Sequence, residues 1–330
     1  MPPDFPSLIF TRIPSLKVGI IGDFAVDLYF DYQTQTGEIS LETGLGVHWG
    51  AQPRASLGAA GNVVQNLLAL GIGTVWVMGC VGPDLFGREM RHLFERQDVQ
   101  TDHLLTVGED WDTCVYAKPM QGDTEANRID FGSHNTLSDN DFNYLLDALR
   151  QRLPQLDALI INQQFPSPLL TPDRIGPLNE LIRQHPTVRF VADLRDSGAL
   201  LRGVTLKVNT AELARFLNIN HPQNPDTDWC VKHGAALTRQ TGGPLVITRG
   251  EAGMLYLDDK HTHAVAGLSL PGPLDTVGAG DTVVAALTAA LGAGASPSQA
   301  LALANAAAAV TVQKLSQTGT ATPEEILNIT

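Results

Sequence analysis

The sequence predicts an α/β layered fold with a mostly parallel central sheet and a small β-sheet lid. Short apolar runs alternate along the chain with longer segments of helical period, and two stretches break this rhythm. The runs are continuous and rich in β-branched residues, which is typical of strands buried on both faces of a parallel sheet. They cover residues 18–21, 75–81, 158–161, 188–192, 204–208 and 245–248.

Between these runs lie segments whose apolar residues recur with helical spacing. Clear examples are residues 62–70, 86–96, 141–153 and 172–184. The alternation of such segments with strand-like runs predicts layers of helix packed on a sheet.

Two stretches that break the rhythm predict the lid. Residues 29–55 and 111–131 are rich in polar residues, with patchy alternation such as Thr113, Val115 and Ala117. We interpret both as strands of a second, smaller sheet inserted into the main fold. The alternative is two long surface loops, but long structureless loops are uncommon in compact domains. No linker divides the chain, so we expect a single domain over residues 1–330.

Composition narrows the class of protein. The hydrophobic fraction of 43% allows a sizeable core, and the net charge of -13 disfavours nucleic acid and anionic membranes as partners. No apolar run reaches the roughly 20 residues that cross a bilayer, and residues 1–14 lack a signal-peptide pattern. Three widely spaced cysteines predict neither a disulfide framework nor a zinc site. We therefore expect a soluble, cytoplasmic protein.

Polar side chains end nearly every apolar run. Ligands of open parallel sheets bind beyond the carboxyl ends of the strands, so these residues predict a site at one edge of the sheet. Asp, Asn and Gly also cap helices and form turns, and for any one position this explanation stays open. The residues are Asp23 and Asp27, Gly82 and Asp84, Asn162, Asp193, Asn209, and Thr248 to Gly250.

The strongest local signal is Gly278-Ala279-Gly280-Asp281, which opens onto a segment of helical spacing. Small residues at a helix N-terminus let backbone N–H groups converge on an anion. Asp281, one residue further, is placed to take a proton from a hydroxyl that attacks a phosphate. The other reading is that Asp281 caps the helix.

A second helix follows, with Ser296 and Gln299 forming a capping box before an Ala-rich segment. Asn305 is the amide in that segment, and it could contact a nucleotide or a neighbouring backbone group. The sequence has no Gly-x-x-x-x-Gly-Lys-Ser/Thr motif, which argues against a P-loop NTPase. It also has no Gly-x-Gly-x-x-Gly after the first strand, which disfavours a dinucleotide-binding dehydrogenase. His261 and His263 are interpreted as part of a solvated hairpin rather than a metal site.

Taken together, these motifs resemble the pfkB, or ribokinase-like, family of carbohydrate kinases, over about residues 18–326. Residues 275–282 are similar to the family's C-terminal signature, and residues 58–62 to its N-terminal glycine signature, with Ala59 in place of the second glycine. Three shorter matches are Gly82-x-Asp84-x-x-Gly87, residues 209–212 and residues 248–253. The resemblance implies a ribokinase-like fold and ATP-dependent phosphorylation of a sugar.

The resemblance also implies roles for individual residues. Asp281 would be the base, and the N–H groups of Gly278, Ala279, Gly280 and Asp281 would stabilise the transferring phosphoryl group. Asp27, Asn62 and Gly58 would contact the sugar. The nucleotide would be held by Asn209, Thr248, Gly250, Gly253 and Asn305, and Mg²⁺ by Glu212. Potassium would bind near Asp275 and Val277, and backbone carbonyls of residues 315–320 would complete the potassium site.

Within the family, residues 38–48, 58–70 and 305–322 are most similar to bacterial heptose-phosphate kinases, for the kinase step only. A phosphorylated acceptor would need cationic partners, and Arg54, Arg128 and Arg195 are candidates, although each could be an ordinary surface arginine. A small sheet with open edges is marginal alone, so we expect a homodimer joined through the lid.

Two other functions stay open. One is a nucleoside or pyridoxal-type vitamin kinase on the same fold, for which the aromatic residues Tyr29, Phe30, Tyr32, Trp49 and Trp111 could stack on a base. The other is a catalytically silent sugar-binding or regulatory protein, which the presence of Asp281 and Glu212 disfavours. The sequence does not name the sugar.

Overall fold

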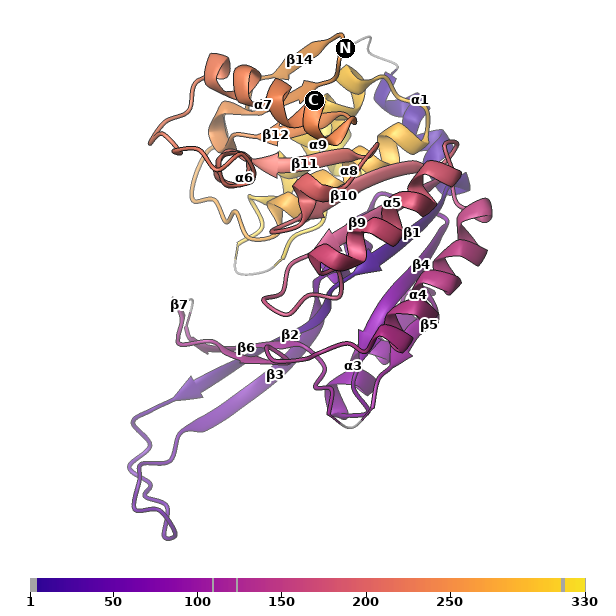
Figure 1. The fold of residues 1–330 in the computed structure, drawn as a ribbon. Helices are drawn as coiled ribbons and strands as arrows, with labels where there is room; N and C mark the ends of the chain where they lie inside the picture. The colour runs from indigo at the N-terminus through magenta and orange to yellow at the C-terminus, as the bar shows by residue number, and fades with distance from the viewer. Residues whose placement is uncertain (1–4, 109, 123, 316–317, 330) are drawn as a thin grey trace.

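The computed structural model describes residues 5–108, 110–122, 124–315 and 318–329. Its main sheet has nine strands in the order β14-β13-β12-β11-β10-β9-β1-β4-β5 (Figure 1). Neighbouring strands are parallel from β5 to β12, while β13 and β14 add an antiparallel edge. The strands are β1 (Lys17–Gly22), β4 (Thr74–Val81), β5 (Gln100–Thr106), β9 (Ala158–Gln163), β10 (Arg189–Leu194), β11 (Thr205–Asn209), β12 (Leu245–Thr248), β13 (Met254–Leu257) and β14 (Thr262–Val265).

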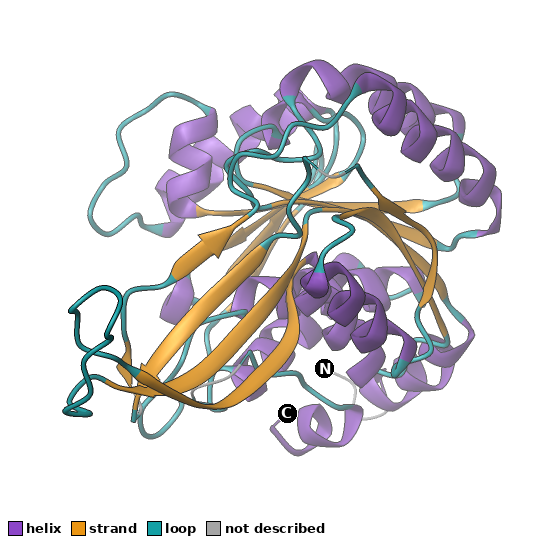
Figure 2. Ribbon diagram, turned by 90° about the horizontal axis from the view of Figure 1, so that it is seen from below, coloured by secondary structure: helices purple, strands orange, loops and turns teal. Residues whose placement is uncertain are grey.

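Helices cover both faces of this sheet (Figure 2). One apolar layer joins the sheet to α1 (Phe5–Arg12), α2 (Ala60–Ala69), α3 (Leu85–Glu95), α8 (Ala279–Gly292), α9 (Pro297–Thr311) and α10 (Pro323–Ile329). The other joins it to α4 (Asp139–Arg152), α5 (Ile175–Gln184), α6 (Thr210–Phe216) and α7 (Thr227–Thr241).

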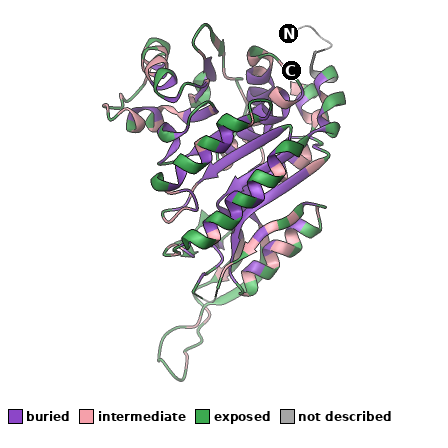
Figure 3. Cartoon of the chain, turned by 45° about the vertical axis from the view of Figure 1, so that its right-hand side comes forward, coloured by how far each residue is buried: buried purple, intermediate pink, exposed green. Residues whose placement is uncertain are grey.

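Side-chain alternation along the strands separates the two layers. Ile160 of β9 lies in the layer of α2 and α8, while Leu159 and Ile161 lie in the opposite layer. All three are fully buried, as is most of the central sheet (Figure 3). Burial on both faces explains why the sequence shows continuous apolar runs here. The predicted α/β fold with a mostly parallel sheet is confirmed.

A second, smaller sheet leaves the main body as a projecting hairpin (Figure 1). Its order is β3-β2-β6-β7, with β8 also paired to β6. Strand β2 is antiparallel to β3 and parallel to β6. The strands are β2 (Phe24–Gln33), β3 (Trp49–Ala59), β6 (Val115–Gln121), β7 (Thr124–Glu125) and β8 (Ile129–Phe131). The predicted second sheet is therefore present.

The boundaries of the smaller sheet differ from those expected. The first hairpin occupies residues 24–59 rather than 29–55, because β2 starts inside the core with Phe24, Ala25 and Val26 buried. Residues 34–48 form the hairpin tip, where the regular pairing is a single bridge between Ile39 and Gly46. No helix in the described part of the chain is both long and apolar enough to cross a membrane.

Candidate active site

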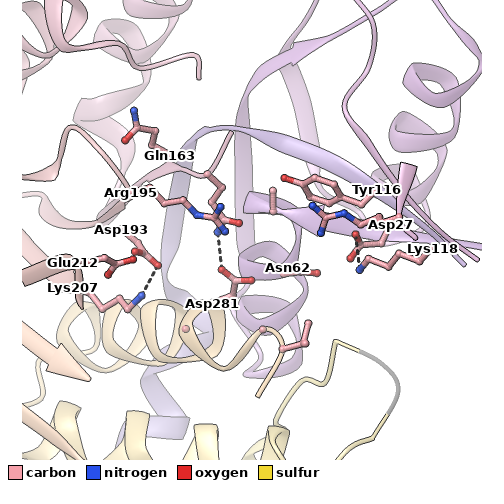
Figure 4. Close-up of a pocket in the computed structure, with 16 residues that line it drawn as sticks. Asp27, Asn62, Tyr116, Lys118, Gln163, Asp193, Arg195, Lys207, Glu212 and Asp281 are labelled. Atoms are coloured by element: carbon pink, nitrogen blue, oxygen red, sulfur yellow. Dashed lines mark hydrogen bonds and ion pairs between the residues drawn. The ribbon is translucent and has the colours of Figure 1, made fainter. Parts of the chain in front are cut away.

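A pocket of about 260 Å³ lies where the smaller sheet meets the carboxyl ends of the main strands (Figure 4). It collects residues from both sheets and from the N-termini of α2 and α8, as the strand-end pattern predicted. The predicted site residues that line it are Asp27, Asn62, Arg128, Arg195, Glu212, Val277, Gly278, Gly280 and Asp281.

Asp281 lies in the first turn of α8 and points into the pocket (Figure 4). Its Oδ1 accepts a hydrogen bond of 3.0 Å from Gln164 Nε2. Burial, followed by the negative charge of Asp193, raises the pKa of Asp281 to about 7. A carboxylate with a pKa near neutrality is a much better proton acceptor than an ordinary exposed aspartate.

The N-terminus of α8 is shaped by Gly278. This residue has φ +77°, and a Cβ there would lie 2.5 Å from Thr318 Cγ2, so a side chain would be excluded. Thr282 Oγ1 donates to Asn66 Oδ1 at 3.0 Å, which fixes α8 against α2. The first N–H groups of a helix lack partners within the helix. Gly278, Gly280 and Asp281 line the pocket at this N-terminus, whereas Ala279 is outside the lining and its N–H donates to Thr276 O at 3.2 Å.

Lys207 lies beside this N-terminus, although the sequence analysis did not select it. Its Nζ is 3.0 Å from Asp193 Oδ2, and both side chains are buried. Burial alone would lower the pKa of Lys207, but the carboxylates of Asp193, Glu212 and Asp281 outweigh burial and raise it. A Cβ on Gly280 would come within 3.2 Å of Lys207 Nζ. A buried positive charge is thus held next to the helix N-terminus.

The other end of the pocket is built on the smaller sheet. Lys118 Nζ lies 3.1 Å from Asp27 Oδ1 and donates to Tyr29 Oη at 2.9 Å. Burial raises the pKa of Asp27, with Lys118 acting in the opposite direction. Gly58 leaves room for this carboxylate, because a Cβ at Gly58 would make a tight contact of 3.0 Å with the Asp27 side chain. Asn62, in the first turn of α2, completes this end.

Ala59 stands at the N-cap of α2 with φ 52° and ψ -126°. This backbone region is strained for any residue with a side chain. Ala59 occupies the position of the second glycine in the signature that the sequence resembles, so the departure from that pattern falls on a residue whose backbone favours glycine.

The three candidate arginines are placed differently. Arg128 makes two hydrogen bonds to Asp130, of 2.7 and 2.8 Å, and its guanidinium lies 4.4 Å from the centre of the Tyr116 ring. Arg195 lines the pocket from the segment after β10 and is exposed. Arg54, on β3, does not line the pocket described here.

The predicted nucleotide residues lie outside the lining of this pocket. Asn209 Oδ1 accepts from Glu212 N and Glu212 Oε2 accepts from Asn209 N, both at 2.8 Å, so this pair forms the capping box of α6. Thr248, Gly250 and Gly253 form the turn from β12 to β13. Asn305 Nδ2 donates to Ala266 O at 3.0 Å.

The predicted cation site near the start of α8 is partly described. Asp275 Oδ1 accepts from Val277 N at 3.0 Å, and Val277 is exposed at the pocket. Residues 316 and 317 of the closing segment 315–320 lie outside the described residues. Among the described residues no cluster of three or more His, Cys, Asp or Glu side chains could hold a metal ion.

Gln163, Gln164, Tyr116, Lys118 and Lys207 line the pocket but were missed as site residues. Gln164 comes directly after β9. The sequence analysis placed the end of this strand at Asn162, two residues before Gln164. Lys118 and Lys207 are buried lysines inside strands. A charged residue within an apolar run, as at Lys207 in residues 204–208, is the signal that could have found the second of them.

The fold and the pocket define an enzyme of the carbohydrate kinase class. The model of the pfkB family carbohydrate kinases matches residues 19–325, and the chain belongs to this family. The predicted resemblance is therefore confirmed.

Several bacterial proteins of one name are similar to this chain. The Bifunctional protein HldE of Trichlorobacter lovleyi is 30% identical over 334 residues, which cover 97% of this chain and 64% of the relative. The chain thus spans just under two thirds of the length of this relative.

Solved structures share the fold. A putative phosphofructokinase from Staphylococcus aureus has a TM-score of 0.74 at 19% identity, covering 94% of this chain and 95% of the other. Phosphofructokinase-2 from Escherichia coli, in complex with fructose-6-phosphate, has a TM-score of 0.71 at 18% identity, covering 95% and 98%. The same enzyme is also known in complex with potassium, with a TM-score of 0.73 at 18% identity and the same coverage.

Proposed function

We propose that this protein transfers the γ-phosphoryl group of ATP to a hydroxyl of a sugar or sugar phosphate, with Asp281 as the general base. The observation that carries the proposal is the position of Asp281, buried in the pocket at the N-terminus of α8 with a pKa raised to about 7. Family membership supplies the reaction class.

The reaction divides between two groups of residues. Asp281 accepts the proton of the acceptor hydroxyl as its oxygen attacks the γ-phosphorus, and ADP leaves. The N–H groups of Gly278 to Asp281, together with Lys207, face the negative charge on the transferring phosphoryl oxygens. Lys207 suits this role because its Nζ lies beside Gly280 and stays protonated through its pairing with Asp193.

The acceptor occupies the end of the pocket formed by the smaller sheet. Asp27 accepts hydrogen bonds from sugar hydroxyls, and Asn62 both donates and accepts. Of the four cationic side chains in the pocket, Lys118, Arg128 and Lys207 already pair with Asp27, Asp130 and Asp193. Arg195 makes no ion pair found among the described residues, which leaves it available to an acceptor that already carries a phosphate. The fructose-6-phosphate complex of a structural neighbour agrees with this class of acceptor.

Nucleotide and cations complete the proposal. The nucleotide would be held by Asn209, Thr248, Gly250, Gly253 and Asn305.

Glu212 is the proposed ligand of Mg²⁺. Its Oε2 accepts the hydrogen bond that caps α6, and its Oε1 makes no hydrogen bond or ion pair found among the described residues. Mg²⁺ keeps several waters and phosphate ligands, so one protein carboxylate is enough, and the ion would neutralise phosphate charge. Replacement Glu212→Gln should raise the Mg²⁺ needed for half-maximal rate. Potassium would bind at Asp275 and Val277.

The smaller sheet acts as a lid in this proposal, and two lids join in a homodimer in the cytoplasm. Its hairpin tip exposes large apolar side chains, including Leu41 at 99%, Leu45 at 69% and Ile39 at 64%. Such residues on an open-edged sheet need a partner surface. Light scattering at micromolar concentration should give the mass of a dimer, and a monomer would contradict the lid interface.

An ADP-release screen tests the proposed reaction. Wild type and Asp281→Asn are compared with ribose, fructose, fructose 6-phosphate, a heptose 7-phosphate and adenosine as acceptors. We expect turnover with a sugar phosphate that depends on Asp281. Preference for adenosine would contradict the acceptor class, and full turnover by Asp281→Asn would contradict the base.

A further inference from the structure

A short segment after β9 connects two buried acidic side chains, Asp23 and Asp281. Asp23 lies between β1 and β2 and is almost fully buried. Its Oδ2 accepts hydrogen bonds from the backbone N–H groups of Gln164 at 2.8 Å and Phe165 at 3.1 Å. Its Oδ1 accepts from Leu169 N at 2.9 Å. One carboxylate therefore holds three N–H groups of a segment without regular structure.

The side chain of Gln164 extends from this clamp to Asp281. Gln164 Nε2 donates to Asp281 Oδ1 at 3.0 Å. An amide that donates to a carboxylate fixes its orientation and favours its charged form. The path from Asp23 to Asp281 thus consists of one clamped backbone group and one side chain.

We propose that Gln164 is the residue that positions the Asp281 carboxylate for proton transfer, and that Asp23 acts through the backbone of Gln164 to hold it there. This inference rests on the proposed role of Asp281 as the base. Both are positioning residues, since Asp23 acts through Gln164 and Gln164 acts through Asp281.

The rest of the segment is anchored independently, which makes the role of Asp23 separable. Arg174 Nη1 donates to Leu169 O at 3.2 Å, and Gln163 Nε2 donates to Leu170 O at 2.9 Å. These contacts hold the far end of the segment when Asp23 is changed. In the described structure, the clamp at Gln164 and Phe165 comes from Asp23.

Other charged groups also face Asp281 and must be kept constant in a test. Asp193 of β10 raises the pKa of Asp281, whereas Lys207 of β11 and Asn62 of α2 lower it. Arg195 and Glu212 line the same pocket. Burial raises the pKa of Asp23 itself to about 6 against the effect of its three N–H partners.

The test measures the pKa of Asp281 without needing an acceptor. Thermal unfolding of matched pairs, with and without Asp281→Asn, is followed between about pH 5 and pH 9. The ionised Asp281 carboxylate destabilises the fold, so the melting temperature of the Asp281→Asn partner exceeds that of its parent by an amount that grows with pH. This difference becomes constant above the folded-state pKa of Asp281, and the pH at which it becomes constant is called the levelling pH. The levelling pH is read in wild type, Gln164→Met, Asp23→Asn and Gln163→Met backgrounds.

We expect Gln164→Met to move the levelling pH upward by about one unit, because the amide donor to the carboxylate is lost. Asp23→Asn should move it in the same direction, because the amide keeps only one acceptor oxygen and its NH2 group must face at least one of the three backbone N–H groups, which loosens the segment that holds Gln164. A purely electrostatic effect of removing a negative charge would have the opposite sign. Combined with Gln164→Met, Asp23→Asn should add no further shift.

Gln163→Met is the matched control, since Gln163 has its own buried contacts with Leu170 and Ser197 and, in the described structure, no hydrogen bond to Asp281. It should lower the melting temperature without moving the levelling pH. An unchanged levelling pH in Gln164→Met would overturn the proposal, as would an additive shift in the double variant. If Asp23→Asn does not fold, Gln164→Met still decides the role of Gln164.

Activity then separates this inference from the function on which it rests. With fructose 6-phosphate as the probe acceptor, the acid limb of kcat/KM in Gln164→Met should move up together with the levelling pH. Loss of turnover in Asp281→Asn with an unmoved limb in Gln164→Met would sustain the base and refute its positioning. Turnover that survives in Asp281→Asn would refute the base itself, whatever Gln164 does.

Discussion

Lys207 Nζ lies 3.0 Å from Asp193 Oδ2, and this buried ion pair stands directly beside the N-terminus of α8. The pair keeps a positive charge in the interior next to the proposed phosphoryl site. The negative charge of Asp193 also raises the pKa of Asp281, while Lys207 lowers it. The two residues of the pair thus act on Asp281 with opposite signs.

Replacement Lys207→Met should therefore damage both catalysis and stability. It leaves Asp193 buried without its partner, which typically costs about 3–5 kcal/mol. The double variant Lys207→Met with Asp193→Asn should regain most of the melting temperature but not the turnover, because the phosphoryl charge still lacks Lys207. Thermal unfolding and ADP release on Lys207→Met and on the double variant check this, and recovery of activity in the double variant would show that Lys207 has only a structural role.

Replacement Asp281→Asn should reduce kcat by about 10²–10⁴-fold while ATP binding persists. In wild type, kcat/KM should fall as pH drops below about 7, where the carboxylate becomes protonated. Stability should change in the opposite sense. The folded-state pKa is raised, so Asp281 favours folding below the unfolded-state pKa, and this contribution is lost as pH rises toward about 7. The variant should therefore melt above wild type at pH 8, and equal melting there would contradict the buried carboxylate.

Replacement Ala59→Gly should stabilise the fold. Ala59 has φ 52°, and glycine relieves that strain at a gain of roughly 1 kcal/mol, reduced by the greater freedom of glycine in the unfolded chain. Ala60→Gly, at the next position inside α2, should lower the melting temperature because glycine weakens a helix. Thermal unfolding of both variants measures the two changes, and a fall in melting temperature in Ala59→Gly as large as that in Ala60→Gly would show that Ala59 carries no strain.

Much of the fold could be predicted because its strands are buried on both faces. The six apolar runs chosen from the sequence all correspond to strands of the main sheet. Strand β5 escaped because it is polar and partly exposed at the sheet edge, as its sequence QTDHLLT shows. The hairpin tip at residues 34–48 was read as strand, although its Thr, Gly and Glu residues form turns and extended segments with one bridge.

The candidate site was predictable where a residue ends a strand or begins a helix. Asn62, Glu212 and Asp281 follow that rule and lie in one pocket. Asp27 lies in the same pocket but inside β2. Gln164 could not be predicted, because its role depends on the path of an irregular segment. That path is held by a hydrogen bond to Asp23, which is 141 residues away in the sequence. A single sequence carries no periodic signal for a contact of that kind.

Arg195 gives the sharpest test of a phosphorylated acceptor. Replacement Arg195→Ala should raise KM for fructose 6-phosphate by about 10-fold or more, because a charge-assisted hydrogen bond contributes roughly 1.5–3 kcal/mol. The KM for fructose should stay close to that of wild type, since fructose lacks the phosphate.

Two further arginines make the comparison specific. Arg128→Ala should have a smaller effect on the same KM, because Asp130 already takes two hydrogen bonds from Arg128. Arg54→Ala should leave both KM values unchanged, since Arg54 is exposed on β3 outside the pocket lining. Steady-state kinetics with both acceptors measures all three variants. An equal rise in KM for fructose and fructose 6-phosphate would mean that Arg195 shapes the pocket without contacting a phosphate.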